Sequence, residues 1–289
     1  MTKWSDRLLQ CFSWLASLVV LSVVLGLMLF LLFRGGSTVG PSLLFGGVPP
    51  GEAILGQRRV FEGIWPALVG TLLLVIGAAL IAVPLGIASG VWLAEYGRGR
   101  LGRWFSVAAS VLAGVPSIIM GLFGFGLILL LRQTLAPEAN TCLLLSMLCL
   151  ALLVLPYLIR TTETALTAIP EPVRLLGPSL GLSHWQTIWH VHMPAARWGI
   201  QRGIVLAVGR IAEDTAVILM TGVVASAGVP QGLTDRYEAL PFAIYYLAAE
   251  HRNAGELNRA FGAALVLLCL NFLLLSLATG LTRLAKRGQ

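Results

Sequence analysis

The sequence predicts an all-α polytopic membrane protein, and two observations carry this prediction. Of the 289 residues, 57% are hydrophobic and only 11% are charged, whereas a soluble domain usually carries about 25% charged residues. Six apolar stretches are each long enough to cross a bilayer, which takes about 20 helical residues. So much apolar surface cannot be buried in one water-soluble core. The composition therefore excludes a soluble enzyme, a disordered chain and a secreted disulfide scaffold.

The six apolar stretches are interpreted as membrane-spanning helices in chain order. They comprise residues 12–33, 65–93, 104–131, 141–159, 199–225 and 258–284. The first follows a short polar head and lacks the short core and clear cleavage site of a signal peptide, so we expect a retained helix. No internal repeat or low-complexity segment stands out.

The distribution of basic residues predicts the orientation of the spans. With the N-terminus inside, twelve Lys and Arg residues and four acids lie in inside segments, whereas seven bases and seven acids lie outside. Membrane proteins keep an excess of Lys and Arg on the cytoplasmic side. We therefore expect both termini to be cytoplasmic.

Two connections between the spans are too long to be simple turns. Residues 34–64 form an external segment rich in Gly and Pro, and residues 160–198 form a cytoplasmic segment with Trp, His and Pro. Long loops in compact proteins usually have a function. We expect three regions: an N-terminal helix with the external segment (1–64), a transmembrane core (65–284) and a cytoplasmic tail (285–289).

The motifs of an ATPase or another enzyme are absent from the sequence. Neither lysine, Lys3 or Lys286, belongs to the phosphate-binding pattern Gly-x-x-x-x-Gly-Lys-Ser/Thr. There is no nucleophile elbow and no His-Glu-x-x-His, and the four cysteines have no paired or metal-like spacing. We therefore expect no cofactor or metal in this chain. If ATP drives the protein, another subunit hydrolyses it.

Three charged residues within the fifth span are the strongest functional signal. Arg210 lies about eleven residues after Gly199, which is about 16 Å along a helix and near the middle of a hydrocarbon core of about 30 Å. Asp214 follows at i+4 and Glu213 flanks it. Such groups usually mark a substrate or ion pathway. The alternative is a buried ion pair that only fixes helix packing.

The chemistry of these residues suits an oxyanion. The planar guanidinium of Arg210 offers paired donors to two oxygens of a phosphate group. The neighbouring carboxylate of Asp214 balances the arginine in an empty site and can accept the proton of hydrogen phosphate, which fully ionised sulfate lacks. Thr215 and Thr221 could add hydroxyl donors. We therefore predict an oxyanion pathway at this span.

Two further patterns concern contacts rather than chemistry. The three histidines of residues 184–192 could suggest a metal site, but the stretch also has two tryptophans and no Cys or carboxylate. We interpret it as a short amphipathic helix that binds a membrane surface or a partner. The glycine pairs Gly86 and Gly90, and Gly199 and Gly203, predict close helix packing, with a dimer interface as the alternative.

A series of short motifs covers residues 65–225 in the order and spacing of one family. The motifs are Gly70-Thr71-Leu72, Pro84-Leu85-Gly86, Leu93-Ala94-Glu95-Tyr96, Ala113-Gly114-Val115-Pro116-Ser117-Ile118, Gly121-Leu122-Phe123-Gly124, Leu155-Pro156, Arg160-Thr161-Thr162-Glu163-Thr164-Ala165-Leu166, Ile169-Pro170, Leu180-Gly181, Met193-Pro194-Ala195 and Gly209-Arg210. On these motifs the chain resembles the membrane subunits of type I ABC importers, most closely phosphate permeases of the PstA type.

The resemblance implies an architecture and a set of partners. It implies a six-helix type I ABC importer permease in a bacterial or archaeal inner or plasma membrane, paired with a second homologous permease in a heterodimer. Two cytoplasmic ATP-binding cassette subunits, which hold ATP and Mg, would dock on the loops. An external phosphate-binding protein would deliver phosphate for alternating-access transport, and no nucleic acid is expected.

The resemblance also implies roles for particular residues. Arg210 matches the family's intramembrane arginine, Asp214 takes the place of a Glu, and Arg160 and Glu163 match a further Arg–Glu pair near the inner end of the fourth span. The segment 170–192 resembles the coupling helix that contacts the ATPase. The coupling residues implied are Arg174, Gly181, His184, Trp185, Trp189 and Pro194.

The surface that would dock the external binding protein is predicted from the topology alone. Residues 34–64 and 226–257 would dock the binding protein there, with Trp65, Tyr237, Tyr245 and Tyr246 as interface residues.

Two departures from the family pattern keep other functions open. Leu175-Leu176-Gly177 stands where the family has Glu-Ala-Ala, and Glu213-Asp214 stands where it has Gly-Glu. The same architecture could therefore carry another oxyanion such as sulfate, molybdate or phosphonate. A proton-coupled secondary transporter, with Asp214 or Glu213 as proton carrier, and a regulatory membrane subunit are the remaining alternatives.

Overall fold

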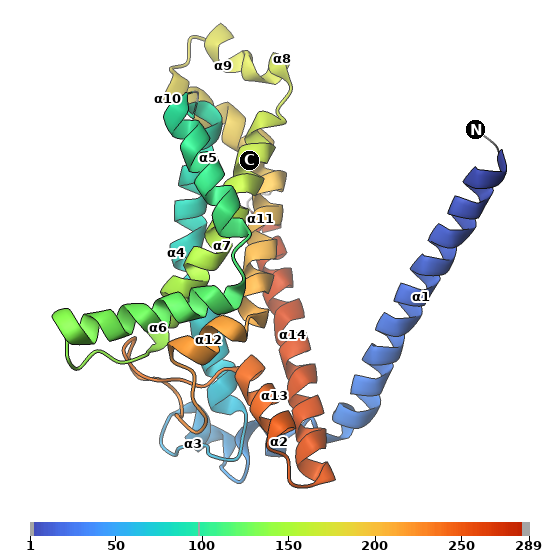
Figure 1. Cartoon of the computed structure of the whole chain (residues 1–289), viewed down its shortest axis with the longest axis vertical. Helices are drawn as coiled ribbons and strands as arrows, with labels where there is room; N and C mark the ends of the chain where they lie inside the picture. Colours follow the sequence, from blue (N-terminus) through green and yellow to red (C-terminus); the bar gives the residue numbers. More distant parts are fainter. Residues whose placement is uncertain (1–2, 98, 285–289) are drawn as a thin grey trace.

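The computed structural model describes residues 3–97 and 99–284. Over these ranges the chain is helical apart from its loops, and an isolated bridge between Val223 and Tyr237 is the β pairing present. Figure 1 shows a long bundle with helices running between two ends. The predicted all-α class is thus confirmed. Arg98 and the predicted tail 285–289 lie outside the described residues.

The elements follow one another in a simple order. They are α1 (Lys3–Gly35), η1 (Gly36–Thr38), α2 (Pro41–Phe45), α3 (Pro50–Ile54), α4 (Trp65–Glu95), α5 (Arg100–Ala113), α6 (Ser117–Thr134), α7 (Leu143–Thr167), α8 (Glu171–Arg174), α9 (Leu176–Ser179), α10 (His184–Thr187), η2 (Ile188–His192), α11 (Met193–Glu213), α12 (Ala216–Thr221), α13 (Leu240–Ala249) and α14 (Ala254–Leu284).

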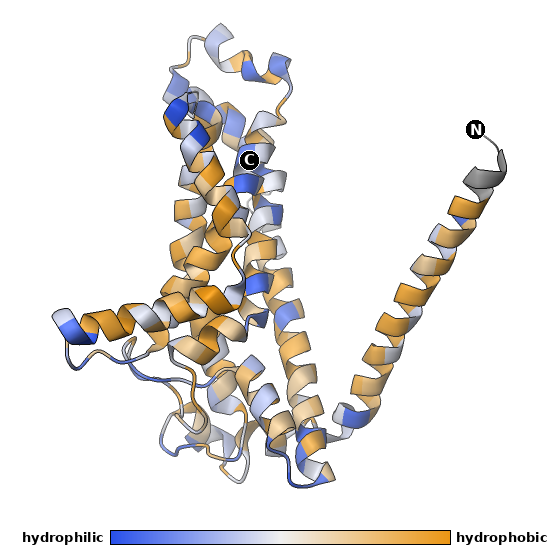
Figure 2. Ribbon diagram, in the orientation of Figure 1, coloured by the Kyte–Doolittle hydropathy of each residue, from blue (hydrophilic) through white to orange (hydrophobic). Residues whose placement is uncertain are grey.

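Helix α7 forms the centre of the bundle. Most of its apolar side chains are buried, and the main hydrophobic cluster joins it to α4, α11 and α12. Figure 2 shows that these central helices are largely apolar and that hydrophilic residues gather at the two ends. This distribution is the one a bilayer requires, because an apolar band must lie between two polar surfaces.

The glycine pairs bring two helices close to α7. A side chain at Gly90 would lie 2.6 Å from the Cβ of Thr162, and one at Gly203 would collide with the hydroxyl of Thr161. Gly86 and Gly199 meet α7 in the same way, at Leu158 and Ala165. The prediction of close helix packing is therefore confirmed, and the partner in both cases is α7.

Five helices are long and apolar enough to cross a membrane. They are α1, α4, α6, α7 and α14, and they make this a multi-pass membrane protein. Helix α11 is not among the five, because it carries Arg197, Arg202, Arg210 and Glu213 within 21 residues. The count of six crossings therefore stays a prediction.

Two predicted spans are interrupted in the structure. The stretch 104–131 breaks at Gly114–Pro116, and α6 turns across the bundle in Figure 1. Proline lacks a backbone N–H and disfavours a helical residue before it, so the break follows from the sequence. The stretch 199–225 breaks between α11 and α12, at Asp214 and Thr215.

The two long loops lie at opposite ends of the bundle. The segment 34–64 folds into α2 and α3 over a small core of Phe45, Ala53 and Val60, to which Trp65 adds its ring. The segment 168–192 forms α8, α9, α10 and η2 at the other end (Figure 1). Helix α1 stands apart and meets α14 near Phe30 and Phe261, whose ring centroids are 5.3 Å apart.

Candidate functional site

The predicted pair of Arg210 and Asp214 forms at the break between α11 and α12. Helix α11 ends at Glu213, and Asp214 has an extended backbone with ψ of 112°. Arg210 Nη2 lies 3.7 Å from Asp214 Oδ2. The Asp214 side chain is 3% exposed, whereas that of Arg210 is 50% exposed. The pair therefore combines a fixed, buried carboxylate with an accessible guanidinium.

Asp214 is held in place by the helix that follows it. Its Oδ1 accepts a hydrogen bond of 3.0 Å from the backbone N–H of Val217, as an N-terminal helix cap does. The other carboxylate oxygen faces Arg210. One side chain thus caps α12 and balances Arg210. The i to i+4 spacing predicted the pair, but the capping preference of Asp is what ends α11 here.

The glycines of α6 allow α12 to pack closely. A Cβ at Gly121 would lie 3.1 Å from the Ala216 carbonyl oxygen, and one at Gly124 would lie 2.9 Å from a Thr221 methyl group. Thr221 is fully buried, and its hydroxyl bonds to Ser146 at 2.8 Å and to the Val217 carbonyl at 2.9 Å. Thr221 therefore serves packing, and the interpretation of its hydroxyl as a pathway donor is wrong. Thr215, partly exposed, lies between Asp214 and the first residue of α12, and its side chain forms no cap hydrogen bond.

Glu213 points in a different direction from Asp214. It is exposed, and Asn271 of α14 donates a hydrogen bond of 3.4 Å to its Oε1. The neighbouring helix α14 thus takes up this extra carboxylate. The three charges of the break do not form a single cluster, because Glu213 turns toward α14 while Arg210 and Asp214 face each other.

Arg160 and Glu163 form a second ion pair on α7. Arg160 Nη1 lies 2.8 Å from Glu163 Oε2, and Arg160 Nη2 donates to the Ser106 carbonyl at 2.5 Å and to the Ser110 hydroxyl. The pair therefore joins α7 to α5. Since Gly203 packs on Thr161, Arg210 lies seven residues further along α11, or about 10 Å toward the α2–α3 end. The two pairs occupy different levels of the bundle.

The predicted coupling residues divide into an inner and an outer set. Trp185 and Trp189 are 61% and 51% exposed, and their rings pack edge to face on the surface. Pro194 lies in the first turn of α11, and Gly181 has a φ of 73°, which favours glycine. Arg174 and His184 instead turn inward to Glu95, whose side chain is only 3% exposed.

The predicted amphipathic helix at 184–192 is continuous with helix α11. It starts at Ser183, which forms a capping box with Gln186, and runs through the π-helical turn η2 directly into α11. The segment predicted to contact a membrane surface or a partner is therefore joined directly to the bundle through α11. No group of His, Cys, Asp and Glu in the described part of the chain could hold a metal ion.

Glu95 was not assigned a role from the sequence. It is the last residue of α4, and three basic residues from the coupling segment surround it. The signal in the sequence was its place at the end of an apolar span, next to a loop that carries Arg and His.

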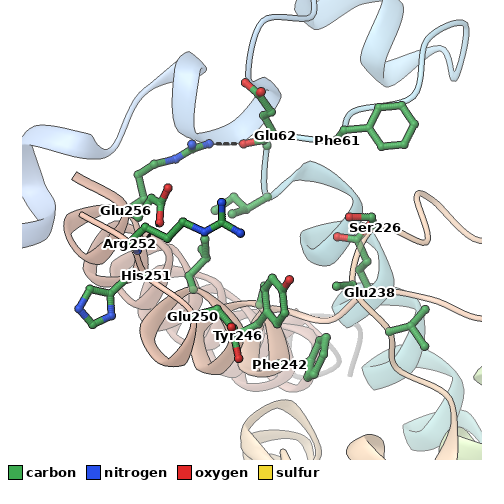
Figure 3. Close-up of a pocket in the computed structure, with 17 residues that line it drawn as sticks. Phe61, Glu62, Ser226, Glu238, Phe242, Tyr246, Glu250, His251, Arg252 and Glu256 are labelled. Atoms are coloured by element: carbon green, nitrogen blue, oxygen red, sulfur yellow. Dashed lines mark hydrogen bonds between the residues drawn. The ribbon is translucent and has the colours of Figure 1, made fainter. Parts of the chain in front are cut away.

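A cavity opens at the opposite end of the bundle, beside α13. Its volume is about 440 Å³, and Figure 3 shows Glu62, Ser226, Glu238, Tyr246 and Arg252 around it. Burial raises the pKa of Glu238, and hydrogen bonds from the backbone of Gly228 and Ala227 partly offset this.

The four aromatic residues predicted to contact the binding protein are not all exposed. Tyr245 and Tyr246 are 58% and 46% exposed, and Trp65 is partly exposed. Tyr237 is fully buried, so its prediction as an interface residue is wrong. It belongs to the hydrophobic core that includes α7.

Comparison with known proteins assigns the chain to a family. Residues 82–287 match the model of the binding-protein-dependent transport system inner membrane component. The phosphate transport system permease protein PstA 1 of Mycobacterium tuberculosis (strain ATCC 25618 / H37Rv) is 37% identical over 207 residues, which are 71% of this chain and 65% of that protein. The chain thus spans just under two thirds of this relative.

Two other relatives match over a larger share of their length. PstA of Haemophilus influenzae is 35% identical over 214 residues, 72% of this chain and 73% of that protein. A probable PstA of Methanocaldococcus jannaschii is 31% identical over 206 residues, 71% of each chain.

A solved structure shares the fold. A chain from the inward-facing MetNI methionine ABC transporter superposes with a TM-score of 0.55 at 18% identity, covering 82% of this chain and 98% of that chain. The expected permease fold of type I ABC importers is confirmed by this match. The chain therefore belongs to the family of inner membrane components of binding-protein-dependent transport systems, with PstA permeases among its relatives.

Proposed function

We propose that this chain is the permease subunit of an ATP-driven importer of inorganic phosphate. The observation that carries the proposal is the Arg210–Asp214 pair, in which a half-exposed guanidinium faces a buried carboxylate at a helix break. The relatives named phosphate transport permeases support the same substrate.

The geometry of the pair suits a ligand that competes for Arg210. At 3.7 Å the Nη2–Oδ2 separation is longer than a charge-assisted hydrogen bond of about 2.7–2.9 Å. The guanidinium therefore keeps donors for two oxygens of a phosphate. Asp214 Oδ2 can accept the proton of hydrogen phosphate, and this acceptor would repel fully ionised sulfate.

Arg160 and Glu163 would act at the next level of the pathway. They lie about 10 Å nearer the predicted cytoplasmic end, and a helix rises 1.5 Å per residue. Both side chains are partly exposed, at 34% and 24%. In the proposed mechanism, alternating access opens the bundle on one side of the Arg210–Asp214 pair at a time, and phosphate passes Arg160 on release.

The energy would come from a partner ATPase dimer at the α8–α10 end. Trp185 and Trp189 are exposed there, together with Leu175, Leu176 and Leu180. An apolar groove on the ATPase would cover these side chains, because exposed patches of this kind mark binding sites. Leu175, which replaces a Glu of the family pattern, makes this contact more apolar. The chain itself would hydrolyse nothing.

Two further partners complete the proposed complex. A second homologous permease would pack against the membrane-exposed faces to enclose the pathway in a heterodimer. An external phosphate-binding protein would dock at the α2–α3 end, where Tyr245 and Tyr246 are exposed beside the cavity of Figure 3.

Another oxyanion is the second candidate substrate. Asp214 is one carbon shorter than the Glu of the family pattern, and Glu213 adds a carboxylate that is bonded to Asn271 of α14. Both changes bear on which anion fits beside Arg210. Sulfate, molybdate and phosphonate are the alternatives to compare.

The test is radiolabelled phosphate uptake by phosphate-starved cells that lack other phosphate systems. Deletion of this chain should abolish uptake, and excess sulfate should not compete with phosphate in cells that contain it. Vanadate should stop uptake, while a protonophore at constant ATP should not. Unchanged uptake after deletion, or competition by sulfate, would contradict the phosphate proposal.

Arg210→Ala should abolish uptake while the complex still assembles in the membrane, because the anion loses its paired donors. Arg210→Lys keeps the charge without the planar fork and should restore only part of the uptake. Normal transport by Arg210→Ala would refute the assigned role.

A further inference from the structure

Glu95 is a buried carboxylate at the end of a long membrane helix. It is the last residue of α4, and 3% of its side chain is exposed. A buried charge is strongly unfavourable unless other groups pair with it. The partners of Glu95 therefore show which part of the protein depends on its charge.

All three basic partners of Glu95 belong to the coupling segment. His192 Nδ1 lies 3.0 Å from Glu95 Oε1, and a carboxylate only accepts hydrogen bonds, so Nδ1 carries the proton. Arg174 Nη1 lies 3.6 Å from the same oxygen, and His184 Nε2 lies 4.0 Å from Oε2. These residues come from α8, α10 and η2, so one side chain of α4 contacts three different elements of the segment.

Neighbouring contacts strengthen the same joint. The ring of Tyr96 packs edge to face on His184, with centroids 5.0 Å apart. Arg174 Nη2 also donates a hydrogen bond of 2.6 Å to the Leu166 carbonyl near the end of α7. The joint surrounds a cavity of about 390 Å³. The side chain of Arg174 therefore links α7, α4 and the coupling segment.

Helix α4 extends from this joint to the opposite end of the protein. Its 31 residues correspond to about 46 Å of helix. At its first turns, Thr71 Oγ1 accepts a hydrogen bond of 2.8 Å from the Leu240 backbone, and Gly70 packs against the Glu238 carbonyl. Glu238 lines the cavity of Figure 3. A displacement of α4 at Glu95 is thus mechanically connected to the wall of that cavity.

We propose that Glu95 is the positioning residue that fastens the coupling segment to α4. Because separation would leave its carboxylate buried without a counter-charge, the segment and α4 move as one unit. Movement imposed on α8–η2 by the ATPase is then passed along α4 to the opposite end of the bundle. The inference rests on the proposed function in that the partner at this end is an ATPase.

The test uses the complete transporter reconstituted in vesicles and the substitution Glu95→Gln. The amide keeps the shape of the side chain and can still accept the hydrogen bond from His192, but it loses the charge that attracts Arg174 and His184. We expect normal assembly and continued ATP hydrolysis, with the phosphate transported per ATP reduced about tenfold, within the range of measured coupling between sites.

Two control variants separate positioning from mere stability. Glu138→Gln changes an exposed carboxylate in the loop between α6 and α7, which forms no ion pair in the described part of the chain, and should leave the phosphate transported per ATP unchanged. Glu95→Asp keeps the charge and should restore most of the ratio. If Glu95→Gln transports normally, or if Glu95→Asp is as defective as Glu95→Gln, the proposal is wrong.

A distance measurement tests the joint without phosphate. In a variant with the exposed Cys11 and Cys269 replaced by Ser, spin labels at Ser179→Cys on α9 and Leu80→Cys on the exposed face of α4 should give one narrow distance, with and without nucleotide. The same labels should give a broad distribution with Glu95→Gln. Narrow distances in both would overturn the inference. If the distances broaden with Glu95→Gln but the complex without this substitution transports no phosphate, the joint is supported and the proposed substrate alone is refuted.

Discussion

Asp214 shows what can and cannot be predicted for a single residue. Its spacing of four from Arg210 predicted an ion pair, and the pair exists. The spacing assumed a continuous helix, yet α11 ends at Glu213 because Asp214 caps α12 through Val217. Asp is favoured at helix N-termini because its side chain accepts a hydrogen bond from a backbone N–H that has no partner within the helix. The pairing followed from helical periodicity, whereas the break depended on a competition between two local structures.

The two roles of Asp214 can be separated by two substitutions. Asn accepts the Val217 hydrogen bond as well as Asp does, so Asp214→Asn should keep the stability and lose phosphate uptake, because Arg210 loses its counter-charge. Asp214→Ala should lose uptake and also about 1 kcal/mol of stability through loss of the cap. The measurements are thermal unfolding of the purified protein and uptake in cells. Equal stability of the two variants would show that the cap contributes nothing.

The sequence predicted that some helices pack closely, but it did not predict that α7 is the helix they pack against. Glycines four residues apart indicated close contacts, and both pairs meet α7, at Thr162 and Thr161 among other residues. Nothing in one sequence indicates that α4 and α11 share the same neighbour. Gly114 and Pro116 indicate the bend between α5 and α6. It was missed because the stretch 104–131 is apolar throughout and hydropathy does not report backbone geometry.

Gly203→Ala should weaken the contact between α11 and α7. The new methyl group would collide with the Thr161 hydroxyl, which already bonds to the Tyr157 carbonyl. Overpacking of this kind typically costs 1–3 kcal/mol, and we expect about that loss in the free energy of unfolding. The control is Gly209→Ala on the same helix, where the added methyl would lie an ordinary 3.7 Å from Leu275. Equal stability of the two variants would contradict the packing account.

As a whole, the molecule has the surface of one part of a larger membrane assembly. The core clusters join α4, α7, α11 and α14, while the side chains of α1 stay exposed along most of its length. Figure 1 shows α1 leaning away from the bundle. The composition predicts that the surface of α1 is apolar. It does not predict the direction in which α1 leaves the bundle, because lipid and a second permease can cover an apolar surface equally well.

The sidedness of the molecule is the prediction that belongs to this scale. In a variant with Cys11 and Cys269 replaced by Ser, Gln57→Cys and Gln231→Cys should react with a membrane-impermeant maleimide added to intact cells. Ser179→Cys should react only after the membrane is made permeable. The basic residues predict this arrangement through the cytoplasmic excess of Lys and Arg. All three positions are exposed in the structure, so accessibility to the reagent depends on the membrane alone.

The same labels decide whether α11 and α12 form the sixth crossing. Helix α11 has 21 residues, or about 31 Å, which matches a hydrocarbon core of about 30 Å. Its charged residues make α11 too polar to be identified as a membrane span from composition alone. However, the Asp214 side chain is buried and Glu213 accepts a hydrogen bond from α14. These partners inside the protein offset the cost of placing charge within the bilayer. Labelling of Ser179→Cys and Gln231→Cys from opposite sides would establish the crossing. Labelling from the same side would mean that Arg210 lies at a membrane surface, where it could not control passage across the membrane.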